Sequence, residues 1–508
     1  MSHADSIVLN GHDLSPATVA AIARENRAVA IDDGARARMA RGRAIVERHL
    51  AEELPVYGLT TGLGSRAVEP LPREALAEFS RLTVRGRSHA LGPPLPRESV
   101  RAIMAVRLNG LLQGGAGADP AVADALAAAL NAGLSPVVPS VGSVGAGDLC
   151  MLAHIGLALI GEGEIEVGGT TLPAARALAQ AGLAPLKLGP KDGLAICNAS
   201  AASAGMGALA LHDAEAIWEL ANLAAALSLE GFRGNSGPLD ARLAAVRPQP
   251  GQAESAAAMR AHLADGALLQ PGAARRLQDP LSLRCAAQVH GALFAALAFA
   301  EPALAAELNG DGSNPVVLID DDEILSTGNF HTPLLTVAFD AVAQACAQVA
   351  QLALARTAKL LTARLSDLPA NLARPGPARS GFAPALKPAE ALVAEIEHLA
   401  LPVRAGVSLS ADGVEDHMTH APLAVRKVTD ILWRLRLILA VELMVAAQAV
   451  DARGPLALGA GCAAAHRAVR GVVPPLDDDR PLGRDIERLD DELLANGALL
   501  RLACAARA

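Results

Sequence analysis

A single tyrosine in a glycine-rich segment is a candidate catalytic residue of this sequence. Tyr57 is the only tyrosine among 508 residues, and it lies in the segment VYGLTTGLG. Because Gly58, Gly62 and Gly64 make the backbone mobile, a tyrosine there is suited to act as a movable general acid or base. The alternative is a loop aromatic that packs on the surface, and the residues alone leave both interpretations open.

Other polar side chains stand in largely apolar surroundings. His89 follows Ser88 in GRSHALG, where a histidine at a helix end commonly bonds a backbone carbonyl. Asn198 lies in DGLAICNASAASAG, where a buried amide needs partners and serves either a substrate or a helix cap. Arg284 interrupts the apolar segment LQDPLSLRCAAQVHG, and a buried guanidinium commonly pairs with a carboxylate of the protein or of a substrate.

The segment SADGVEDHMTH concentrates ionisable residues with some likeness to a metal site. It contains Glu415, Asp416, His417 and His420. The histidines are three positions apart beside two carboxylates, but the order is not HExxH and no third ligand is evident. We therefore expect no metal at this segment.

The segment VGSVGAGDLC, residues 141–150, is typical of a glycine-rich loop that opens a helix. It holds Ser143, Ala146, Gly147 and Asp148. A helix that begins after Asp148 would direct its positive N-terminal end toward this loop, and such an end favours anions.

The elements that must position these residues are predicted to be helices. Hydrophobic residues make up 52% of the chain and aromatic residues only 2%, so alanine and leucine carry the core and favour helix over strand. We expect an all-α fold with a long central helical bundle and a short hairpin in GEIEVGGTTLP. The long helices are predicted over residues 193–231, 283–308, 333–364, 386–400 and 422–450.

The domain organisation follows from the same pattern. We expect an N-terminal part over residues 1–192 that carries the loops, followed by the bundle and C-terminal helices over residues 193–508. Since no linker separates the two parts, they are expected to form one continuous folding unit.

Composition excludes several classes of protein. The net charge is −9 without a basic stripe, which argues against a nucleic-acid partner. Six cysteines without a CxxC pair predict neither a zinc site nor a disulfide framework. The apolar stretch 431–450 contains Arg434, Arg436 and Glu442, which favours a buried bundle helix over a membrane span. With no signal-peptide pattern at the N-terminus, we expect a cytoplasmic protein without a membrane partner.

Taken in order, these segments resemble the aromatic amino acid ammonia-lyase family, and are nearest to its histidine-specific members. The resemblance runs from about residue 50 to the C-terminus through YGLTTGLG, SHALG, GSVGAGDLCMLAH, DGLAICN, QDPLSLRCAAQVHG, GNFH and VEDH. It implies an all-α fold of the ammonia-lyase and fumarase–aspartase type. It also implies a homotetramer in which each active site is built from three subunits.

The resemblance assigns a role to each matching residue. It implies that Tyr57 is the base for the β-proton, that Asn198 holds the electrophile and substrate, and that Arg284 pairs with the substrate carboxylate. The residues that it implies contact the rest of the substrate are Ser88, His89, Phe330 and Glu415.

The sequence departs from the family where the family builds its electrophile. Members form a methylidene-imidazolone ring from Ala-Ser-Gly, whereas here Ala146 is followed directly by Gly147. Ser143 is followed by Val144, which lacks the freedom of glycine to close such a ring. Leu281 also replaces a tyrosine of the family pattern. We therefore expect no methylidene-imidazolone and no other cofactor.

Three functions remain in view. The first is a ring-free lyase that eliminates or adds nitrogen on a histidine-like or other small α-amino acid, as aspartase-type lyases do on a similar bundle. The second is an ordinary histidine-specific member that converts histidine to urocanate and ammonia. The third is a binding protein without catalysis. The retained Tyr57, Asn198, Arg284 and Glu415 favour the first.

Overall fold

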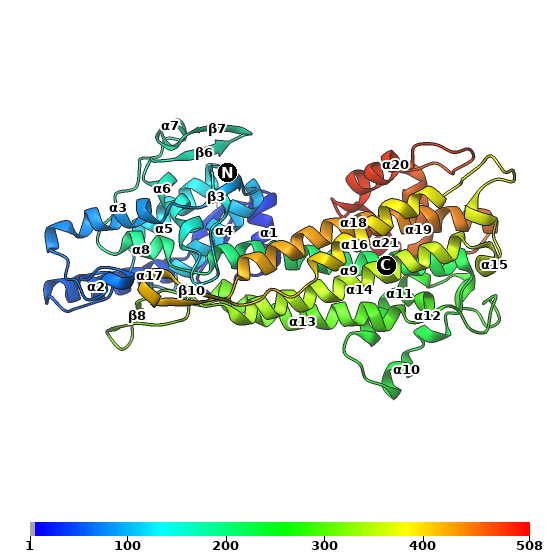
Figure 1. Ribbon diagram of the computed structural model, residues 1–508, viewed down its shortest axis with the longest axis horizontal. Coiled ribbons are helices and arrows are strands. Elements are labelled where there is room, and N and C mark those ends of the chain that lie inside the picture. The colour runs from blue at the N-terminus through cyan, green and yellow to red at the C-terminus, as the bar shows by residue number, and fades with distance from the viewer. Residues whose placement is uncertain (1–5, 508) are drawn as a thin grey trace. The chain divides into compact units, whose positions relative to one another are not determined.

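The structure, a computed structural model, describes residues 6–507 and is built mainly of helices, which confirms the predicted all-α class (Figure 1). It divides into two compact units. The first unit comprises Met1–His212, Ala300–Ala338 and Pro402–Arg426, and the second comprises Asp213–Phe299, Phe339–Leu401 and Lys427–Ala508. Because long helices leave one unit and enter the other, neither unit is continuous in sequence, and the expected boundary at residue 192 falls inside the first.

The first unit begins with a series of helices of modest length. The first of them is capped at its N-terminal end, where the Ser15 side chain accepts a hydrogen bond from the Thr18 backbone N–H and Pro16 opens the helix. The helices of this unit are α1 (Pro16–Arg24), α2 (Asp33–Ala51), α3 (Leu76–Arg87), α4 (Arg97–Leu111), α5 (Pro120–Asn131), α6 (Leu149–Leu159), α7 (Ala174–Gln180), α8 (Asp192–Cys197) and α17 (Ser410–Gly413).

The strands of the first unit are short and form small separate sheets. The hairpin of β6 and β7 is the one predicted in GEIEVGGTTLP. The pairings are parallel β1 (Ile7–Leu9) with β2 (Val29–Ile31), and antiparallel β3 (Leu91–Pro94) with β5 (Pro139–Val141), β4 (Ser135–Pro136) with β6 (Glu164–Val167), β6 with β7 (Thr170–Pro173), β8 (Val316–Leu318) with β9 (Glu323–Leu325), and β10 (Gly406–Leu409) with β11 (Glu415–Met418).

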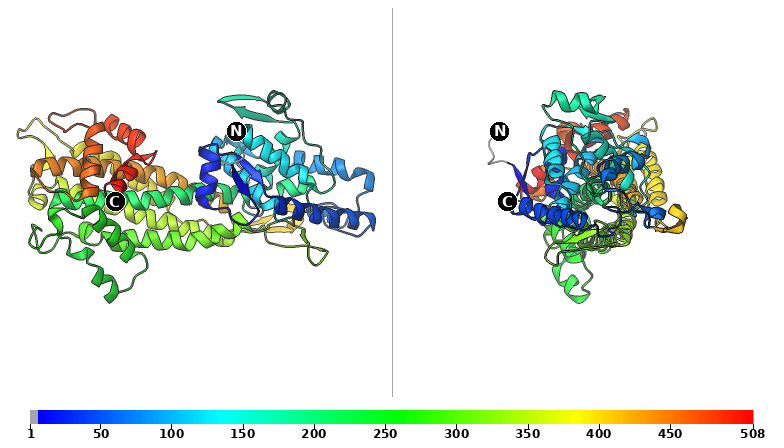
Figure 2. Two further views of the ribbon diagram at one scale, coloured as in Figure 1. Left: turned by 180° about the vertical axis from the view of Figure 1, so that it is seen from behind. Right: turned by 90° about the vertical axis from the view of Figure 1, so that its left-hand side faces the viewer.

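The second unit is organised by the longest helices of the chain, which run alongside one another within it (Figures 1 and 2). They are α9 (Ala201–Phe232), α13 (Ala286–Asn309), α14 (Pro333–Leu361) and α18 (Ala421–Arg453), and each begins or ends in the first unit. The shorter helices are α10 (Ala241–Val246), α11 (Gln252–Leu263), α12 (Leu281–Arg284), α15 (Ala363–Ser366), α16 (Leu386–Leu399), α19 (Ala460–Val472), α20 (Leu482–Leu489) and α21 (Ala498–Ala505).

A buried polar network joins the long helices of the second unit. Arg356 on α14 and Glu442 on α18 form an ion pair at 2.6 Å, with both side chains fully buried. Ser228 on α9 donates to Glu442 at 2.7 Å, and Arg356 lies 3.5 Å from Nε2 of His290 on α13. His290 in turn bonds Asn222 on α9 at 2.9 Å. Because each helix contributes a partnered group, the network fixes how the helices align.

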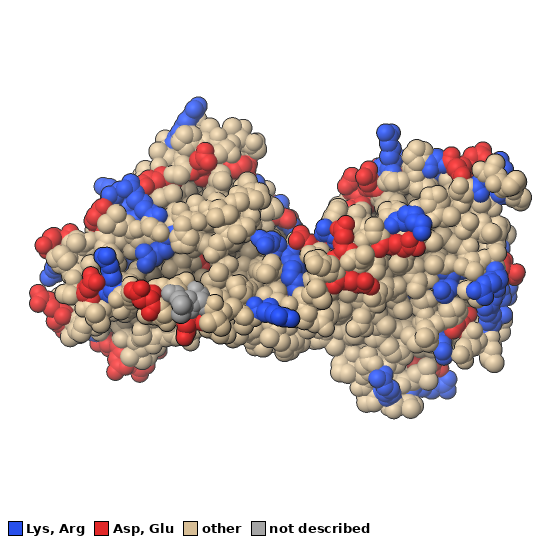
Figure 3. All heavy atoms as spheres, viewed as in Figure 1, with Lys and Arg blue, Asp and Glu red and all other residues tan. Residues whose placement is uncertain are grey.

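Three segments are long and apolar enough to cross a membrane by length and composition alone: Asp192–Phe232, α13 and α14. The most apolar window of Asp192–Phe232 is entirely buried within the protein, so packing accounts for its hydropathy. The corresponding windows are 61% buried in α14 and 39% buried in α13, and Phe299, Leu334 and Val337 are exposed. The surface over α13 carries few charged side chains (Figure 3).

Candidate active site

The first unit contains a cavity of about 940 Å³ at which loops and helix ends from distant parts of the chain meet. Most of the residues singled out from the sequence line it, although they lie more than 350 positions apart at the extremes. These residues are Tyr57, His89, Ser143, Ala146, Gly147, Asn198, Phe330 and Glu415.

Tyr57 is followed by a tight turn at which glycine is strongly favoured. Gly58 has φ +64°, and a Cβ there would lie 2.6 Å from Leu63 and 2.7 Å from Leu194. The backbone N–H of Gly64 donates to the Tyr57 hydroxyl oxygen at 3.1 Å. A donor directed at that oxygen stabilises negative charge on it, which suits a residue that takes up a proton.

Asn198 reaches the cavity at the end of α8. The predicted helix over 193–231 is interrupted here, because Asn198 leaves helical geometry with φ −93° and ψ 92° before α9 begins. Its amide donates to the carbonyl oxygen of Asn314 at 2.9 Å. The buried guanidinium of Arg107 donates to the carbonyl of Ala195 on α8 at 3.0 Å, and burial lowers the pKa of Arg107 to about 10. These bonds fix both the helix and the side chain.

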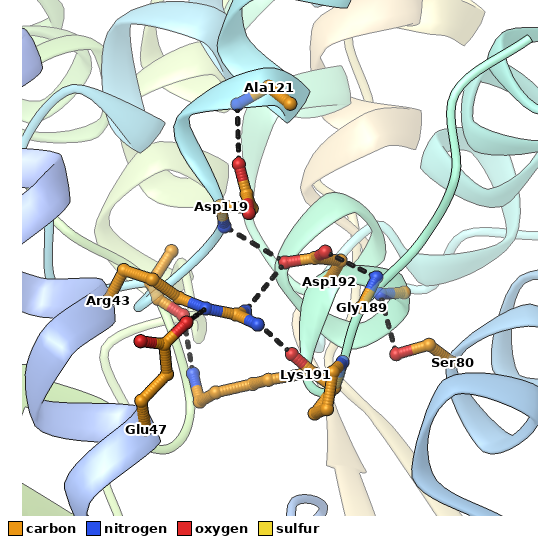
Figure 4. Close-up of polar contacts among 11 residues, drawn as sticks. Arg43, Glu47, Ser80, Asp119, Ala121, Gly189, Lys191 and Asp192 are labelled. Atoms are coloured by element: carbon orange, nitrogen blue, oxygen red, sulfur yellow. Dashed lines mark hydrogen bonds and ion pairs between the residues drawn. The ribbon is translucent and has the colours of Figure 1, made fainter.

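The N-terminal end of α8 packs against a cluster of charged side chains, buried except for Glu47 (Figure 4). Arg43 and Asp192 form an ion pair at 3.2 Å, and Arg43 also bonds Glu47 at 3.0 Å. The Asp192 carboxylate accepts the backbone N–H of Gly189 at 2.7 Å and that of Asp119 at 2.9 Å. Burial raises the pKa of Asp192, while Arg43 opposes that shift. Every charged group in the cluster thus has partners within the protein.

Lys191 links this cluster to Asn198. Its ammonium donates to the carbonyl of Ala116 at 2.5 Å and to that of Pro315 at 3.1 Å. Pro315 follows Asn314, whose own carbonyl binds the Asn198 amide. One lysine therefore supports both the helix that carries Asn198 and the segment that binds its side chain. Burial lowers the pKa of Lys191 to about 8.

The loop between β5 and α6 is fastened by backbone hydrogen bonds from two sides. Gly147 donates to the carbonyl of Phe330 at 3.2 Å, and His420 donates to the carbonyl of Val144 at 2.8 Å. Gly147 has φ +71°, and a Cβ there would lie 2.9 Å from Oδ1 of Asn198. The loop is thus packed closely against Asn198, with room for hydrogen only at position 147.

Asp148 lies beneath this loop and is fully buried rather than part of the cavity wall. The hydroxyl of Ser143 donates to its carboxylate. Ser203 adds its backbone N–H at 2.7 Å and its hydroxyl at 3.2 Å. Burial raises the pKa of Asp148, and these donors oppose the shift. Asp148 therefore anchors Ser143 and the loop.

The residues of this loop do not fit the methylidene-imidazolone ring. Such a ring closes when a glycine nitrogen attacks a carbonyl carbon two residues earlier, across a serine that loses water. Here the nitrogen of Gly147 is already bonded to the carbonyl carbon of Ala146. The hydroxyl of Ser143 is engaged by Asp148, and Val144 stands at the position that would have to close a ring across Ser143.

The β10–β11 hairpin brings acids and imidazoles to the cavity. Glu415, Asp416 and His417 all line it. Nδ1 of His417 lies 2.8 Å from Nε2 of His331, so one of these two nitrogens donates and the other accepts. Burial lowers the pKa of His331, and His417 adds to that shift. Within residues 6–507, no group of three or more His, Cys, Asp or Glu side chains is arranged to hold a metal ion.

Some predicted residues lie elsewhere. Ser88 is turned into its own helix, where its hydroxyl donates to the carbonyl of Val84 at 2.8 Å. Arg284 belongs to the second unit and does not line the cavity, and its Nε is buried without a partner among the described residues. Leu281, which is 60% exposed, lines a separate cavity of about 490 Å³ in the second unit.

Other cavity residues were not singled out from the sequence. Arg87 and Asn314 line the cavity, and so does His331. His331 belongs to the segment GNFH, in which the sequence pointed to Asn329 and Phe330 but not to the histidine. No local sequence motif marks Arg87 or Asn314 as a site residue. Their place in the cavity depends on contacts between segments that are far apart in the sequence.

The comparisons with known proteins agree with this fold. The family model of the aromatic amino acid lyases matches residues 14–471. Histidine ammonia-lyase of Gloeobacter violaceus is 40% identical over 505 residues, which cover 99% of this chain and 98% of the relative. The crystal structure of histidine ammonia-lyase from Trypanosoma cruzi is 31% identical with a TM-score of 0.91, covering 98% of this chain and 95% of that one.

A further solved structure is similar to the same degree. It is ergothionase from Treponema denticola, an ergothioneine-degrading enzyme in complex with desmethyl-ergothioneine sulfonic acid. It is 33% identical with a TM-score of 0.91, and the match covers 99% of each chain. The protein belongs to the aromatic amino acid lyase family. It is accordingly a carbon–nitrogen lyase with the helical ammonia-lyase fold.

Proposed function

We propose that this lyase breaks, or in reverse forms, the carbon–nitrogen bond of a histidine-like or other small α-amino acid without a methylidene-imidazolone ring. One observation carries the proposal. The cavity keeps Tyr57, Asn198 and Glu415 together around a loop in which Ala146 is joined directly to Gly147.

The retained residues suffice for an elimination. The Tyr57 oxygen takes the proton from the β-carbon, and the electron pair of that C–H bond forms the new double bond. The C–N bond breaks, and its pair leaves with the nitrogen. Glu415 offers a carboxylate to the substrate nitrogen, while the amide of Asn198 is held in place by Asn314. His89 and Phe330 line the same cavity and are proposed to contact the side chain of the substrate.

Without the ring, the substrate itself must make the elimination feasible. One way is a substrate nitrogen that is already a good leaving group when the C–N bond breaks. The similarity to an ergothioneine-degrading enzyme supports a histidine-derived betaine as one candidate, because a quaternary nitrogen has no lone pair to add to an electrophile. The other way is a β-proton made more acidic by a neighbouring group.

We also propose a homotetramer with shared active sites. Arg284 belongs to the second unit, and in the proposed assembly it binds the substrate carboxylate in the cavity of another copy. The exposed apolar side chains on α13 and α14, Phe299, Leu334 and Val337, support burial against another copy. We propose a cytoplasmic location and a small amino acid as the partner, with neither nucleic acid nor membrane.

An ordinary histidine ammonia-lyase is the second candidate. It is favoured by relatives of that name at 40% identity and by His89 and Glu415 in the cavity. It requires the ring to form by another route from a loop that lacks the serine. A binding protein without catalysis, the third alternative left open by the sequence, is set aside because the chain belongs to a family of carbon–nitrogen lyases.

Intact-mass measurement together with turnover separates these functions. We expect the protein to have its encoded mass. We also expect it to consume at least one substrate from a panel of histidine, ergothioneine and aspartate, and the control variant Tyr57→Phe to consume none. A mass lower by two water molecules together with urocanate production would establish the ordinary lyase. If no substrate in the panel is consumed, or if Tyr57→Phe consumes it equally well, the proposed mechanism is wrong.

A further inference from the structure

Arg87 is a cation without a partner in the wall of the cavity. It is the last residue of α3, it is half-buried, and it lines the cavity. Across residues 6–507 no hydrogen bond or ion pair joins its guanidinium to another group. On the same helix, Arg81 and Arg85 lie 3.6 Å and 2.6 Å from Glu162. The other arginines of this helix end are thus paired, and Arg87 is not.

The position of Arg87 at a helix end does not account for this difference. A cation in the last turn of a helix interacts favourably with the helix dipole, but Arg85 supplies that interaction equally. What distinguishes Arg87 is the cavity, where it is the one lysine or arginine among the described lining residues. The guanidinium is planar and binds carboxylates through paired hydrogen bonds.

The cavity therefore offers charges of both signs to a ligand. Glu415 and Asp416 supply carboxylates from β11, and Arg87 supplies a guanidinium from α3. An amino acid presents a cationic nitrogen and an anionic carboxylate. Since the resemblance gives the α-carboxylate to Arg284, Arg87 is left for a different anionic group of the same molecule.

A second anionic group also meets the chemical need of a ring-free elimination. The β-proton of an ordinary amino acid is barely acidic. A carboxylate on the β-carbon accepts the electron pair that the departing proton leaves behind, at the cost of an added negative charge. A cation fixed beside that carboxylate stabilises the charge as it develops.

We propose that Arg87 binds a second carboxylate of the substrate, carried by the carbon that loses the proton. This inference rests on the proposed ring-free elimination. The Cβ–H bond breaks, the proton goes to the Tyr57 oxygen, and the electron pair enters the carboxylate held by Arg87. That pair then forms the carbon–carbon double bond while the C–N bond breaks and its pair leaves with the nitrogen. An amino acid with an acidic side chain gives an unsaturated dicarboxylate and an amine.

Equilibrium binding tests the inference without relying on turnover. Fumarate and crotonate share a carboxylate and a double bond, and differ in that crotonate has a methyl group in place of the second carboxylate. By calorimetry we expect the full-length protein to bind fumarate about 10- to 100-fold more tightly, as expected for one charge-assisted contact. Arg87→Leu should remove that preference, and Arg85→Leu, the matched control on the same helix, should keep it.

The inference is overturned if fumarate binds no more tightly than crotonate, or if Arg87→Leu keeps the preference. It is also overturned if Arg87→Leu weakens both ligands equally, because the residue would then bind the shared carboxylate. Arg87→Lys provides a second variant that keeps the charge, and should retain part of the preference.

Turnover then separates this inference from the proposed function. Consumption of histidine but not of aspartate, by a protein of unshifted mass, would retain the ring-free lyase and reject the role of Arg87. A mass lower by two waters would reject the ring-free lyase. The binding measurement would then still decide separately whether Arg87 binds a second carboxylate.

Discussion

Arg43 and Arg87 both belong to the first unit, but the protein supplies partners only to Arg43. Arg43 contacts Asp192, Glu47 and the carbonyl of Pro190 beneath α8. Arg87 lines the cavity and has no partner among residues 6–507. Arg87 is half-buried, so its charge loses part of its hydration without gaining a protein partner in exchange. The difference separates a charge that holds the structure together from one that we propose binds the substrate.

The largest expected effect concerns the base in the cavity. Tyr57→Phe should lower kcat by about 10²- to 10⁴-fold, because it removes the oxygen that is proposed to take up the proton. Stability should change little, since that oxygen accepts a single hydrogen bond from the described residues, from the Gly64 backbone N–H. Steady-state kinetics and thermal unfolding measure the two quantities. Unchanged kcat in a folded variant would remove Tyr57 from the mechanism.

Breaking a buried ion pair should have the opposite effect to Tyr57→Phe, because it should lower the stability of the protein. Glu442→Ala leaves Arg356 buried without its partner, and should lower the free energy of unfolding by about 3–5 kcal/mol. Glu415→Ala, at an exposed acid of the cavity, is the matched comparison and should lower activity with little change in stability. Denaturant unfolding checks both. Equal destabilisation by the two variants would abolish the distinction between them.

Lys191 belongs to the structural charge cluster but also supports Asn198, so its replacement should lower the activity. Lys191→Met deprives the carbonyls of Ala116 and Pro315 of their donor and loosens the support of Asn198. We expect a loss in kcat of up to about 10²-fold, since small misplacements of a catalytic group have effects of that size. Lys187→Met, at an exposed lysine, is the control and should retain full activity.

A buried histidine without partners gives a pH dependence of stability. His262 is fully buried, neither ring nitrogen has a partner among the described residues, and burial lowers its pKa to about 4. The unfolded chain takes up a proton near its ordinary pKa of 6.5, whereas the folded one does not until about pH 4. Stability should therefore be fully present above pH 6.5 and fall toward pH 4, by at most about 1.4 kcal/mol per pH unit.

The variant His262→Leu isolates that contribution. Its unfolding free energy should show a shallower fall between pH 6.5 and pH 4 than the parent protein, measured by denaturant unfolding at each pH. An identical slope in the two proteins would mean that His262 already has a partner for its charged form.

The smallest effect is expected at an exposed ion pair. Arg81 contacts Glu78 at 2.6 Å, and both side chains are largely exposed. Glu78→Ala should leave the free energy of unfolding almost unchanged, because water screens such pairs. A loss as large as that of Glu442→Ala would show that exposure does not govern the value of a pair in this protein.

Sequence alone predicted the helical fold and most of the cavity, because motif segments carry local information. Tyr57, Asn198 and Glu415 were found through such segments. The interruption of the predicted helix at Asn198 was missed, because the surrounding alanines and serines continue a helical pattern. The backbone of Asn198 nevertheless leaves helical geometry where its side chain enters the cavity. The support by Lys191 and the unpartnered state of Arg87 depend on contacts between remote segments, which no local pattern records.

Ring-free chemistry is tested most directly at the loop itself. Cleavage before aspartates releases residues 124–147, which end in Ala146 and Gly147. Mass spectrometry of this peptide from active protein should give the encoded mass. A peptide lighter by two water molecules, from protein that turns over substrate, would contradict ring-free elimination.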